Sequence, residues 1–404
     1  MTLSATDTNN TTECVRLTTP DAICEAMRQC ATGGRPMVDY GKAHADMGHL
    51  PPDESIRFQL VTAAPIIEHY DRDLTVRAHA GATMGQLQQR LMATGQFLPI
   101  DADDDLSLGE VIAHHVYGPM RIAYGSVRDL LLGMSFVDGN GKVVRVGGRT
   151  VKNVAGYDLT RFMVGSMGEM GIIHEATIRT YAVPEAVMSV RAELDGPTFF
   201  DEHLTALLLS SAEPAALAVT RDKQRWLAQL DYMGTHKACA AQFEGLQAFV
   251  HEHSAARVVD MHPRTMAEVL QHGVAQRSWR RTAAAVVKVV VPPASSGVVA
   301  EHIAAIFGDS TPCELHLLPA HGCLFVGGNL SSDKIRHLSE TIDGLIESVG
   351  GMRTWMRMPN DAHDIAPFAP MRTEHKLLVR LKDTLDPAWR LNPGRFLRRE
   401  EHGA

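Results

Sequence analysis

The sequence has few of the features that mark membrane-spanning, disulfide-rich or nucleic-acid-binding proteins. Its longest apolar stretch, residues 283–291, is interrupted by Lys288 and closed by Pro292-Pro293, so it is too short for a bilayer and predicts a buried strand. The six cysteines form no C-x-x-C pair, which argues against a disulfide framework and against an iron–sulfur site in this chain. The net charge of −8 argues against nucleic acid as a partner.

No dinucleotide fingerprint of the Rossmann type is present either. Gly139-x-Gly141 lacks a third glycine and a following helix, which disfavours a nicotinamide dehydrogenase of that fold. Asp138-Gly139-Asn140-Gly141 instead predicts a hairpin between strands at 130–137 and 142–146.

Other local patterns predict helix starts and strands in the first half of the chain. Thr19-Pro20-Asp21 is typical of a helix N-terminus, and Thr83 to Gln86 is a capping box. Residues 74–80 alternate in polarity with period two, so they predict a half-buried strand. The polar residues 1–14 predict a flexible tail.

Beyond Pro184 the pattern changes, and no internal repeat is visible. Strand-like and helix-like segments alternate there, which predicts a separate α+β cap domain with a mainly antiparallel sheet. The expected strands are 187–194, 225–232, 283–291 and 323–327, and the expected helices are 238–251, 296–306 and 332–349.

The most informative segment is rich in glycine. It includes Gly147 to Asp158, with the string Lys152-Asn153-Val154-Ala155-Gly156-Tyr157-Asp158, and continues through Gly165, Gly168 and Gly171 into a strand. So many glycines are costly to order, and we interpret them as allowing backbone to approach a flat or phosphorylated ligand. The Lys152 ammonium and the loop N–H groups are candidate donors to an anion.

These residues carry a family resemblance. The segments 118–121, 124–129, 132–133 and 147–158, with Asn392-Pro393-Gly394-Arg395-Phe396 near the end, resemble the FAD-binding subunits of glycolate oxidases, which are vanillyl-alcohol-oxidase-type (PCMH-type) flavoproteins. The resemblance implies an α+β fold. Residues 15–185 would form an FAD-binding domain of two small α+β subdomains, 186–380 the cap domain, and 381–404 a segment that docks on the FAD domain.

The resemblance also implies a set of FAD-binding residues. The pyrophosphate would sit on backbone amides of the Gly41-Lys42 loop and near Ser107 to Gly109, the isoalloxazine near 118–129, and the adenine against Ile172. The expected residues are Gly41, Lys42, Ser107, Gly109, Gly118, Tyr124, Gly125, Arg128, Asp129, Lys152, Asn153, Gly156, Tyr157, Asp158, Gly165, Ser166, Gly168, Gly171 and Ile172.

By the same resemblance, the chain is expected to be one subunit of a heteromeric glycolate dehydrogenase. A larger flavin-containing subunit would hold the 2-hydroxy acid, and an iron–sulfur subunit would pass on the electrons. We expect a cytoplasmic location, with contact to the inner membrane only through partners. Two alternatives stay open: a self-sufficient FAD-dependent 2-hydroxy-acid oxidoreductase, and a degenerate flavin fold kept as a scaffold. No catalytic residue is nominated.

Several residues bear on these alternatives. Glu110 stands where the family has a second glycine, and a carboxylate near a pyrophosphate is repulsive, so either its side chain turns away or FAD binds less tightly. We interpret His44 as an unreactive surface residue and not as a covalent flavin anchor. His114-His115 are poor joint ligands on an extended segment, and His316 and His321 are interpreted as strand-end histidines. No metal site is expected.

Overall fold

The computed structural model describes residues 14–39, 55–148, 159–253, 256–307, 313–362, 365–368 and 375–397. The chain divides into two compact units. Unit 1 comprises Met1–Tyr117, Ser126–Ala182 and Met371–Ala404, and unit 2 comprises Gly118–Gly125 and Val183–Pro370.

Unit 1 contains two separate main sheets. One is a small parallel sheet of order β1-β3-β2, and the other is a five-stranded antiparallel sheet of order β4-β5-β9-β7-β8. The strands are β1 (Cys14–Leu17), β2 (Met37–Asp39), β3 (Ile56–Leu60), β4 (Ile66–Tyr70), β5 (Thr75–His79), β7 (Leu131–Val137), β8 (Val143–Gly147) and β9 (Ile172–Arg179), with a minor pair of β6 (Gln96–Phe97) and β10 (Tyr181–Ala182).

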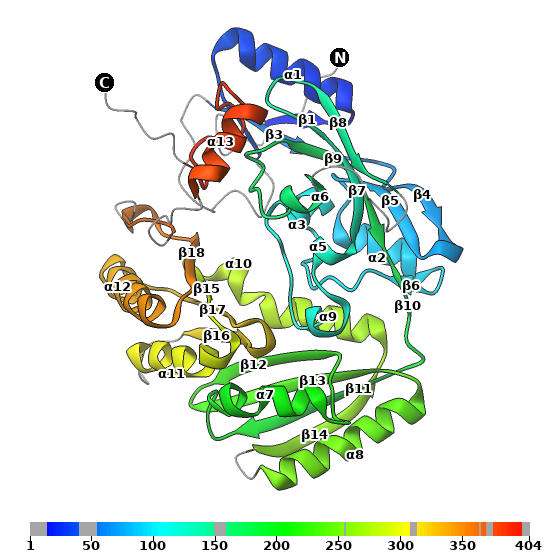
Figure 1. The fold of residues 1–404 in the computed structure, drawn as a ribbon, viewed down its shortest axis with the longest axis vertical. Helices are drawn as coiled ribbons and strands as arrows, with labels where there is room; N and C mark the ends of the chain where they lie inside the picture. The colour runs from blue at the N-terminus through cyan, green and yellow to red at the C-terminus, as the bar shows by residue number, and fades with distance from the viewer. Residues whose placement is uncertain are drawn as a thin grey trace. The chain divides into compact units, whose positions relative to one another are not determined.

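Short helices cover these sheets, and their starts follow from local sequence. Thr19 accepts a hydrogen bond from Ala22 N at the start of α1, and Thr83 and Gln86 form the predicted capping box of α2. The predicted hairpin is confirmed as β7 and β8. The helices are α1 (Pro20–Gly33), α2 (Met84–Met92), α3 (Leu108–Ala113), α5 (Val127–Leu130), α6 (Leu159–Phe162) and α13 (His375–Leu385). Figure 1 shows that α13, in red, lies in the same unit as the N-terminal α1, in blue.

Unit 2 is built on one eight-stranded sheet in which every strand pair is antiparallel. The strand order is β14-β11-β13-β12-β16-β17-β15-β18. Its elements are α4 (Arg121–Tyr124), β11 (Ala186–Leu194), α7 (Phe199–Leu209), β12 (Ala216–Asp222), β13 (Arg225–Gly234), α8 (His236–Glu252), β14 (Ala256–Arg264), α9 (Met266–Arg277), α10 (Trp279–Thr282), β15 (Ala285–Val290), α11 (Ser296–Phe307), β16 (Glu314–Leu318), β17 (Cys323–Gly328), α12 (Ser332–Val349) and β18 (Met352–Arg357).

Unit 2 consists of two structural repeats, which were not predicted from the sequence. The elements β11-α7-β12-β13-α8-β14 and β15-α11-β16-β17-α12-β18 are both β-α-β-β-α-β units. The strand order reads the same from both edges of the sheet, so the halves are related by a pseudo-two-fold at the pairing of β12 with β16. The repeat was invisible in sequence because only the alternation of buried residues recurs, not the residues themselves.

The two faces of this sheet have different surroundings. One face carries the hydrophobic core, in which Val190, Leu230, Leu317 and Val326 pack with residues of α7, α8, α11 and α12. The opposite face carries polar side chains such as Ser189, because successive residues of a strand alternate between faces. The predicted α+β class with a mainly antiparallel sheet is confirmed.

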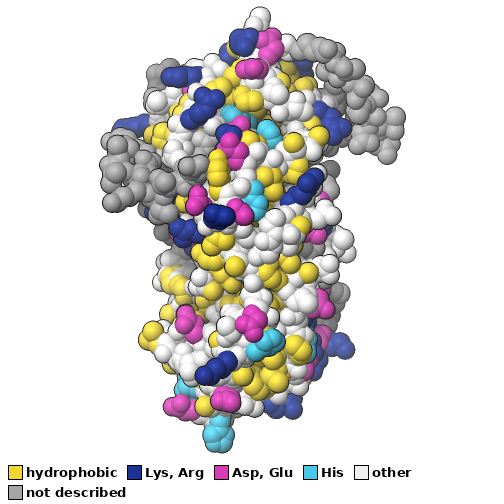
Figure 2. All heavy atoms as spheres, turned by 90° about the vertical axis from the view of Figure 1, so that its right-hand side faces the viewer, with side chains coloured by type: hydrophobic (Ala, Val, Ile, Leu, Met, Phe, Trp, Pro, Cys, Tyr) yellow, Lys and Arg dark blue, Asp and Glu magenta, His cyan; other side chains and the backbone are white. Residues whose placement is uncertain are grey.

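Several properties of the described residues bear on the setting of the protein. None of the helices in the described ranges has both the length and the apolar character of a membrane span. All six cysteines fall within these ranges, and they are free thiols. On the face of the molecule drawn in Figure 2, acidic, basic and apolar side chains of the described residues are interspersed.

Candidate functional site

Unit 1 contains a cavity of about 270 Å³ between its two main sheets and α3. That volume is close to the lower end of the range typical of ligand-binding pockets. The lining residues are Arg16, Asp39, Phe58, Gln59, Leu60, Val61, Thr62, Gly81, Thr83, Gln86, Asp105, Ser107, Gly109, Glu110, Ala113, Gly168, Gly171, Ile172, Ile173 and Asn392.

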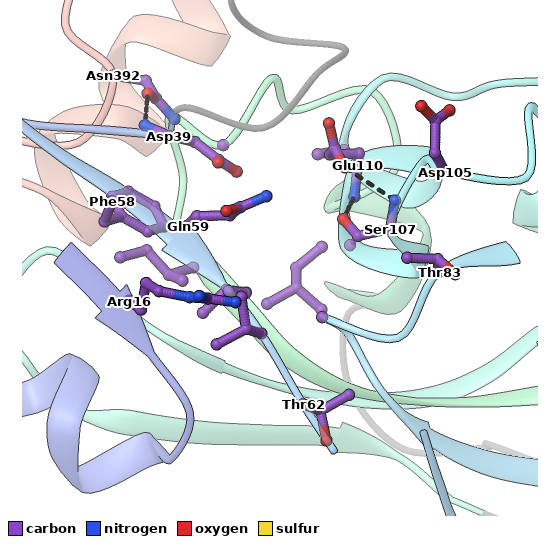
Figure 3. Close-up of a pocket in the computed structure, with 18 of the residues that line it drawn as sticks. Arg16, Asp39, Phe58, Gln59, Thr62, Thr83, Asp105, Ser107, Glu110 and Asn392 are labelled. Carbon is purple, nitrogen blue, oxygen red and sulfur yellow. Dashed lines mark hydrogen bonds between the residues drawn. The ribbon is translucent and has the colours of Figure 1, made fainter. Parts of the chain in front are cut away.

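The cavity has an apolar wall and polar ends. Phe58 and Ile172 belong to the core and form part of the apolar wall. Figure 3 shows Asp39 and Asn392 together at one end, and Ser107 and Glu110 at the other. An apolar wall with polar groups at its ends fits a ligand that joins a flat ring to polar groups.

The charges that line the cavity are mostly negative. Among the described residues that line the cavity, Arg16 is the one cation, whereas Asp39, Asp105 and Glu110 are acidic. A pyrophosphate would therefore need cations from other segments, for which the sequence offers Lys42 and Lys152, both outside the described residues.

The backbone amides at the start of α3 are already paired within the protein. Ser107 N donates to a Glu110 carboxylate oxygen (2.8 Å), and Glu110 N donates to Ser107 Oγ (3.2 Å). Leu108 N and Gly109 N donate to carbonyl oxygens of Ala82 and Ala80, each over 2.8 Å. The Glu110 side chain thus does not turn away from the helix start: it caps α3 and lines the cavity.

The structure brings some of the predicted FAD-binding residues to this cavity and separates others from it. Those that line the cavity are Ser107, Gly109, Gly168, Gly171 and Ile172. Those outside the described residues are Gly41, Lys42, Lys152, Asn153, Gly156, Tyr157 and Asp158, together with His44. Gly118, Tyr124 and Gly125 belong to unit 2, where the Tyr124 hydroxyl donates to Met233 Sδ (3.7 Å).

The remaining predicted residues have local roles in unit 1. Arg128 and Asp129 are exposed, and the Asp129 carboxylate accepts hydrogen bonds from the backbone N (2.8 Å) and Oγ (2.9 Å) of Ser126, which caps α5. Gly165 N donates to Ile112 O (3.0 Å). Ser166 Oγ is buried and has no hydrogen-bond partner within the described part of the chain.

Two of the cavity glycines are closely packed within the protein. A Cβ on Gly171 would lie 2.6 Å from the Phe136 ring, and one on Gly109 would lie 3.2 Å from Ala80 Cβ. Close packing between elements therefore accounts for Gly171 and leaves little room at Gly109, and the contact of these glycines with a ligand stays a prediction.

A second polar cluster, which the sequence analysis did not assemble, lies on the face of the unit 2 sheet opposite the hydrophobic core, next to α10. Register places His316 of β16 opposite Thr220 of β12 and Phe325 of β17, and Phe325 opposite Lys288 of β15. Directly paired residues share a face, so these side chains form one row across the sheet. The Arg280 guanidinium, from α10, lies 3.5 Å from the centre of the Phe325 ring. We call Arg280, Lys288, His316 and Phe325 the cationic row.

Hydrogen bonding fixes the protonation of His316. Arg280 Nη2 lies 2.6 Å from His316 Nδ1, and because an arginine only donates, Nδ1 must accept. Burial, with Arg280 and Arg277 nearby, holds the pKa of His316 well below its usual range. The neutral ring therefore carries its proton on Nε2, which is buried and has no hydrogen-bond partner among the described residues. His316 lies in the middle of β16, so its interpretation as a strand-end residue was wrong.

Several positive groups of the described residues surround the cationic row. Burial, Arg280 and Arg121 lower the pKa of Lys288, although the Cys323 thiol opposes them. His321, in the turn between β16 and β17, has its pKa lowered to about 4 by burial and by Arg121. At neutral pH the positive charge of the row therefore comes from Arg280, while burial and the neighbouring arginines disfavour the charged form of Lys288. No group of three potential metal ligands occurs among the described residues.

Comparison with known proteins identifies the class of unit 1. Residues 13–147 match the protein family described as FAD binding domain. This stretch contains β1 to β8 and most of the cavity lining, and the apolar wall with polar ends fits a ligand that joins a flat ring to polar groups. The chain therefore carries an FAD-binding domain of the PCMH type, and its cofactor is FAD.

Three individual proteins are similar to parts of this chain. Glycolate oxidase subunit GlcE of Escherichia coli is 32% identical over 177 residues, which are 43% of this chain and 50% of that protein. The mitochondrial D-lactate dehydrogenase [cytochrome] of Arabidopsis thaliana is 31% identical over 182 residues, covering 45% of this chain and 32% of that protein. Glycolate oxidase subunit GlcD of Bacillus subtilis is 27% identical over 200 residues, covering 49% and 43%. The matched part spans half of these relatives' length or less.

Solved structures share the fold over nearly the whole chain. An alkyldihydroxyacetonephosphate synthase superposes with a TM-score of 0.67 at 14% identity, covering 95% of this chain and 77% of the other. At that identity the likeness concerns the fold, and it extends beyond the FAD-binding domain into unit 2.

Proposed function

We propose that this chain is the FAD-binding subunit of a heteromeric dehydrogenase that oxidises glycolate, a small 2-hydroxy acid, to glyoxylate. The observation that carries the proposal is the cationic row, because a 2-hydroxy acid presents a carboxylate beside a hydroxyl group. The names of the relatives, which include glycolate oxidase subunits and D-lactate dehydrogenases, support this substrate class.

The residues of the cationic row have different roles in binding such an acid. Arg280 supplies positive charge for the carboxylate, and a guanidinium can bind it through two parallel hydrogen bonds. His316 Nε2–H is a buried donor suited to a carboxylate or hydroxyl oxygen. Phe325 holds the Arg280 guanidinium flat against the sheet.

FAD, when bound, supplies the acceptor for the hydride that leaves the substrate carbon. A base with a pKa near the working pH takes the hydroxyl proton most effectively. His316 and His321 both have pKa values below that range, so we assign them hydrogen-bonding roles.

The substrate assignment is tested by anaerobic titration of the FAD-loaded protein, or of its complex, with glycolate, D-lactate and L-lactate. Arg280→Met should raise the substrate concentration needed to bleach the flavin by tenfold or more, as expected when one charged hydrogen bond is lost. Arg281→Met removes an exposed charge from the same helix and is the matched control. If Arg280→Met and Arg281→Met need the same substrate concentration to bleach the flavin, the cationic row is not the substrate site.

We also propose partner subunits: a larger flavin-containing subunit and an iron–sulfur subunit that receives the electrons, with any membrane contact made through them. Two observations support this. The relatives include two different glycolate oxidase subunits, and the cysteines of this chain are dispersed free thiols. Co-purification with tagged chain from its own host, followed by identification of the partners and an iron assay, tests the proposal. Purification of the chain without partners and with full activity would refute it.

A second candidate is a self-sufficient 2-hydroxy-acid oxidoreductase. The cationic row favours it, since this chain itself carries an acid-binding cluster. Reduction of a dye by the isolated, FAD-loaded chain distinguishes the two: turnover that a partner does not increase supports self-sufficiency, and turnover that needs a partner supports the heteromer.

A further inference from the structure

The segment from Lys382 to Leu397 reaches the cavity of unit 1 through Asn392, although it begins about two hundred residues after β10, the preceding strand of that unit. Met37 N donates to Arg390 O (2.7 Å) and Asn392 N donates to Met37 O (2.8 Å), so the segment pairs with β2 as an additional short strand. This places Asn392 at the cavity, beside the end of β2.

The side chain of Asn392 bridges two walls of the cavity. Its Oδ1 accepts from Asp39 N (2.9 Å), and its Nδ2 donates to Met167 O (3.2 Å). Asp39 ends β2, and Met167 precedes the lining residue Gly168. Asn392 is 1% exposed and has a φ of 43°, a left-handed conformation that asparagine tolerates better than most residues. Figure 3 shows the Asn392–Asp39 bond at the cavity's edge.

A buried ionic network holds Asn392 in place. The Lys382 ammonium, fully buried, donates to Asp386 Oδ2 (2.7 Å), to Leu391 O (2.7 Å) and to the carbonyl oxygen of Glu169. All three ammonium hydrogens therefore have acceptors. Asp386 Oδ2 also accepts from Leu391 N (2.8 Å), so the residue before Asn392 is bound at both its N–H and its carbonyl.

The Glu169 side chain binds the far end of the same C-terminal segment. Its carboxylate accepts from Phe396 N (2.6 Å) and Leu397 N (3.1 Å). It follows Gly168 directly, so the loop that forms a cavity wall is tied to the C-terminal segment through both its backbone and a side chain.

We propose that this C-terminal segment is a positioning element of the FAD site, in which Asn392 sets the spacing of the cavity walls and Lys382 fixes Asn392. The proposal takes FAD as the cofactor of unit 1 and is independent of the substrate. Asn392 acts through Asp39 and Met167. It is a positioning residue, and its loss should weaken FAD binding more than it weakens the fold.

The test compares FAD affinity with the thermal stability of the FAD-free full-length chain. Asn392→Gly keeps the left-handed backbone accessible and removes only the amide. Asn140→Gly, the same change at an exposed turn residue of unit 1, is the control. We expect Asn392→Gly to weaken FAD binding roughly tenfold, the effect of one to two hydrogen bonds, with little change in the melting temperature of the FAD-free chain.

A second variant tests the coupling. Lys382→Met with Asp386→Asn removes the ion pair without leaving a lone buried charge. Lys382 and Asp386 act on FAD through Asn392. A triple variant that combines this double substitution with Asn392→Gly should therefore bind FAD no more weakly than whichever of its two parent variants binds FAD less tightly. The proposal is overturned if Asn392→Gly binds FAD within twofold of wild type. It is also overturned if the fold-losses of FAD affinity in the two parent variants multiply fully in the triple variant. If wild type itself bound no FAD, the cofactor assignment would fail as well, which distinguishes the two failures.

Discussion

Ser107 and Glu110 satisfy each other's backbone amides at the first turn of α3, through hydrogen bonds of 2.8 and 3.2 Å. The amides between them are paired with Ala80 and Ala82. The start of this helix is therefore closed within the protein and presents a carboxylate to the FAD cavity.

The first prediction follows from that carboxylate. Glu110→Gln keeps the capping box, because glutamine can accept the same bond, and it removes one negative charge from the cavity. We expect FAD to bind several-fold more tightly, by on the order of 1 kcal/mol, at unchanged thermal stability. Fluorescence titration with FAD at low salt measures the effect, and Glu25→Gln on the exposed side of α1 is the control. Weaker binding in Glu110→Gln would show that the carboxylate assists the cofactor.

A second prediction concerns the donor on His316. Oxalate, a small dicarboxylate, serves as the probe. His316→Gln can place an N–H near the position of Nε2, whereas His316→Asn can accept from Arg280 through Oδ1 but its shorter side chain cannot bring an N–H to the position of Nε2. We expect oxalate to bind His316→Gln within about threefold of wild type and His316→Asn about tenfold more weakly, measured calorimetrically.

Because the pKa of His316 is far below neutral, wild type and His316→Gln should also show parallel oxalate affinities from about pH 6 to about pH 8. His337→Asn on the exposed face of α12 controls for the loss of a histidine. Equal oxalate affinity in the glutamine and asparagine variants would exclude a role for Nε2–H.

The third prediction is a pH dependence of stability. Burial raises the pKa of Glu169 from its ordinary 4.5 to about 7, although Lys382 and the N–H groups of Phe396 and Leu397 oppose the shift and Asp386 adds to it. A carboxyl whose pKa is higher in the folded state contributes stability below pH 4.5, and this is lost as the pH rises to about 7.

Thermal melts of the FAD-free chain across this interval should therefore show a decline that Glu169→Gln lacks. The difference between the two proteins should be on the order of 3 kcal/mol over the whole interval. Since both variants share every other titrating group, comparing their slopes isolates Glu169. Identical slopes would mean that the carboxyl stays ionised in the folded protein.

The fourth prediction separates two neighbouring glycines. Gly147 has a φ of 68°, and a Cβ there would lie 2.3 Å from Leu132 O, whereas a Cβ on Gly148 would meet nothing within 4 Å. Gly147→Ala should lower the free energy of unfolding by roughly 2 kcal/mol or more, and Gly148→Ala should change it by less than about 0.5 kcal/mol. Denaturant titration checks both. A large loss in Gly148→Ala alone would contradict this reading.

Local sequence was a good guide where structure is decided by neighbours in the chain. The capping box at Thr83 and the hairpin at Asp138 depend on side-chain-to-backbone bonds within a few residues, so they could be predicted. Four strands and three helices of unit 2 were predicted with boundary errors of a few residues, because burial alternates with a clear period there, whereas β12, β14, β16, β18 and α7 were not predicted.

Features that depend on distant pairing could not be predicted in the same way. The cationic row joins Lys288, His316 and Phe325 only because β16, β17 and β15 are neighbours, an order that no local pattern encodes. The role of Asn392 depends on its pairing with Met37. The domain boundaries and most of the FAD-binding residues inferred from the family resemblance stay predictions, several of them outside the described residues.

The pseudo-two-fold of unit 2 has an evolutionary consequence. Two copies of one β-α-β-β-α-β unit each bring their own helices, so either copy could change the exposed face of its strands without disturbing the other's core. On the face opposite the core, the second copy carries Lys288 and His316 of the cationic row, whereas the first copy carries Arg191 and His262 together with Asp231 and Asp260. The two halves have thus diverged in the charges of this face while keeping the same strand order, and they meet where β12 pairs with β16.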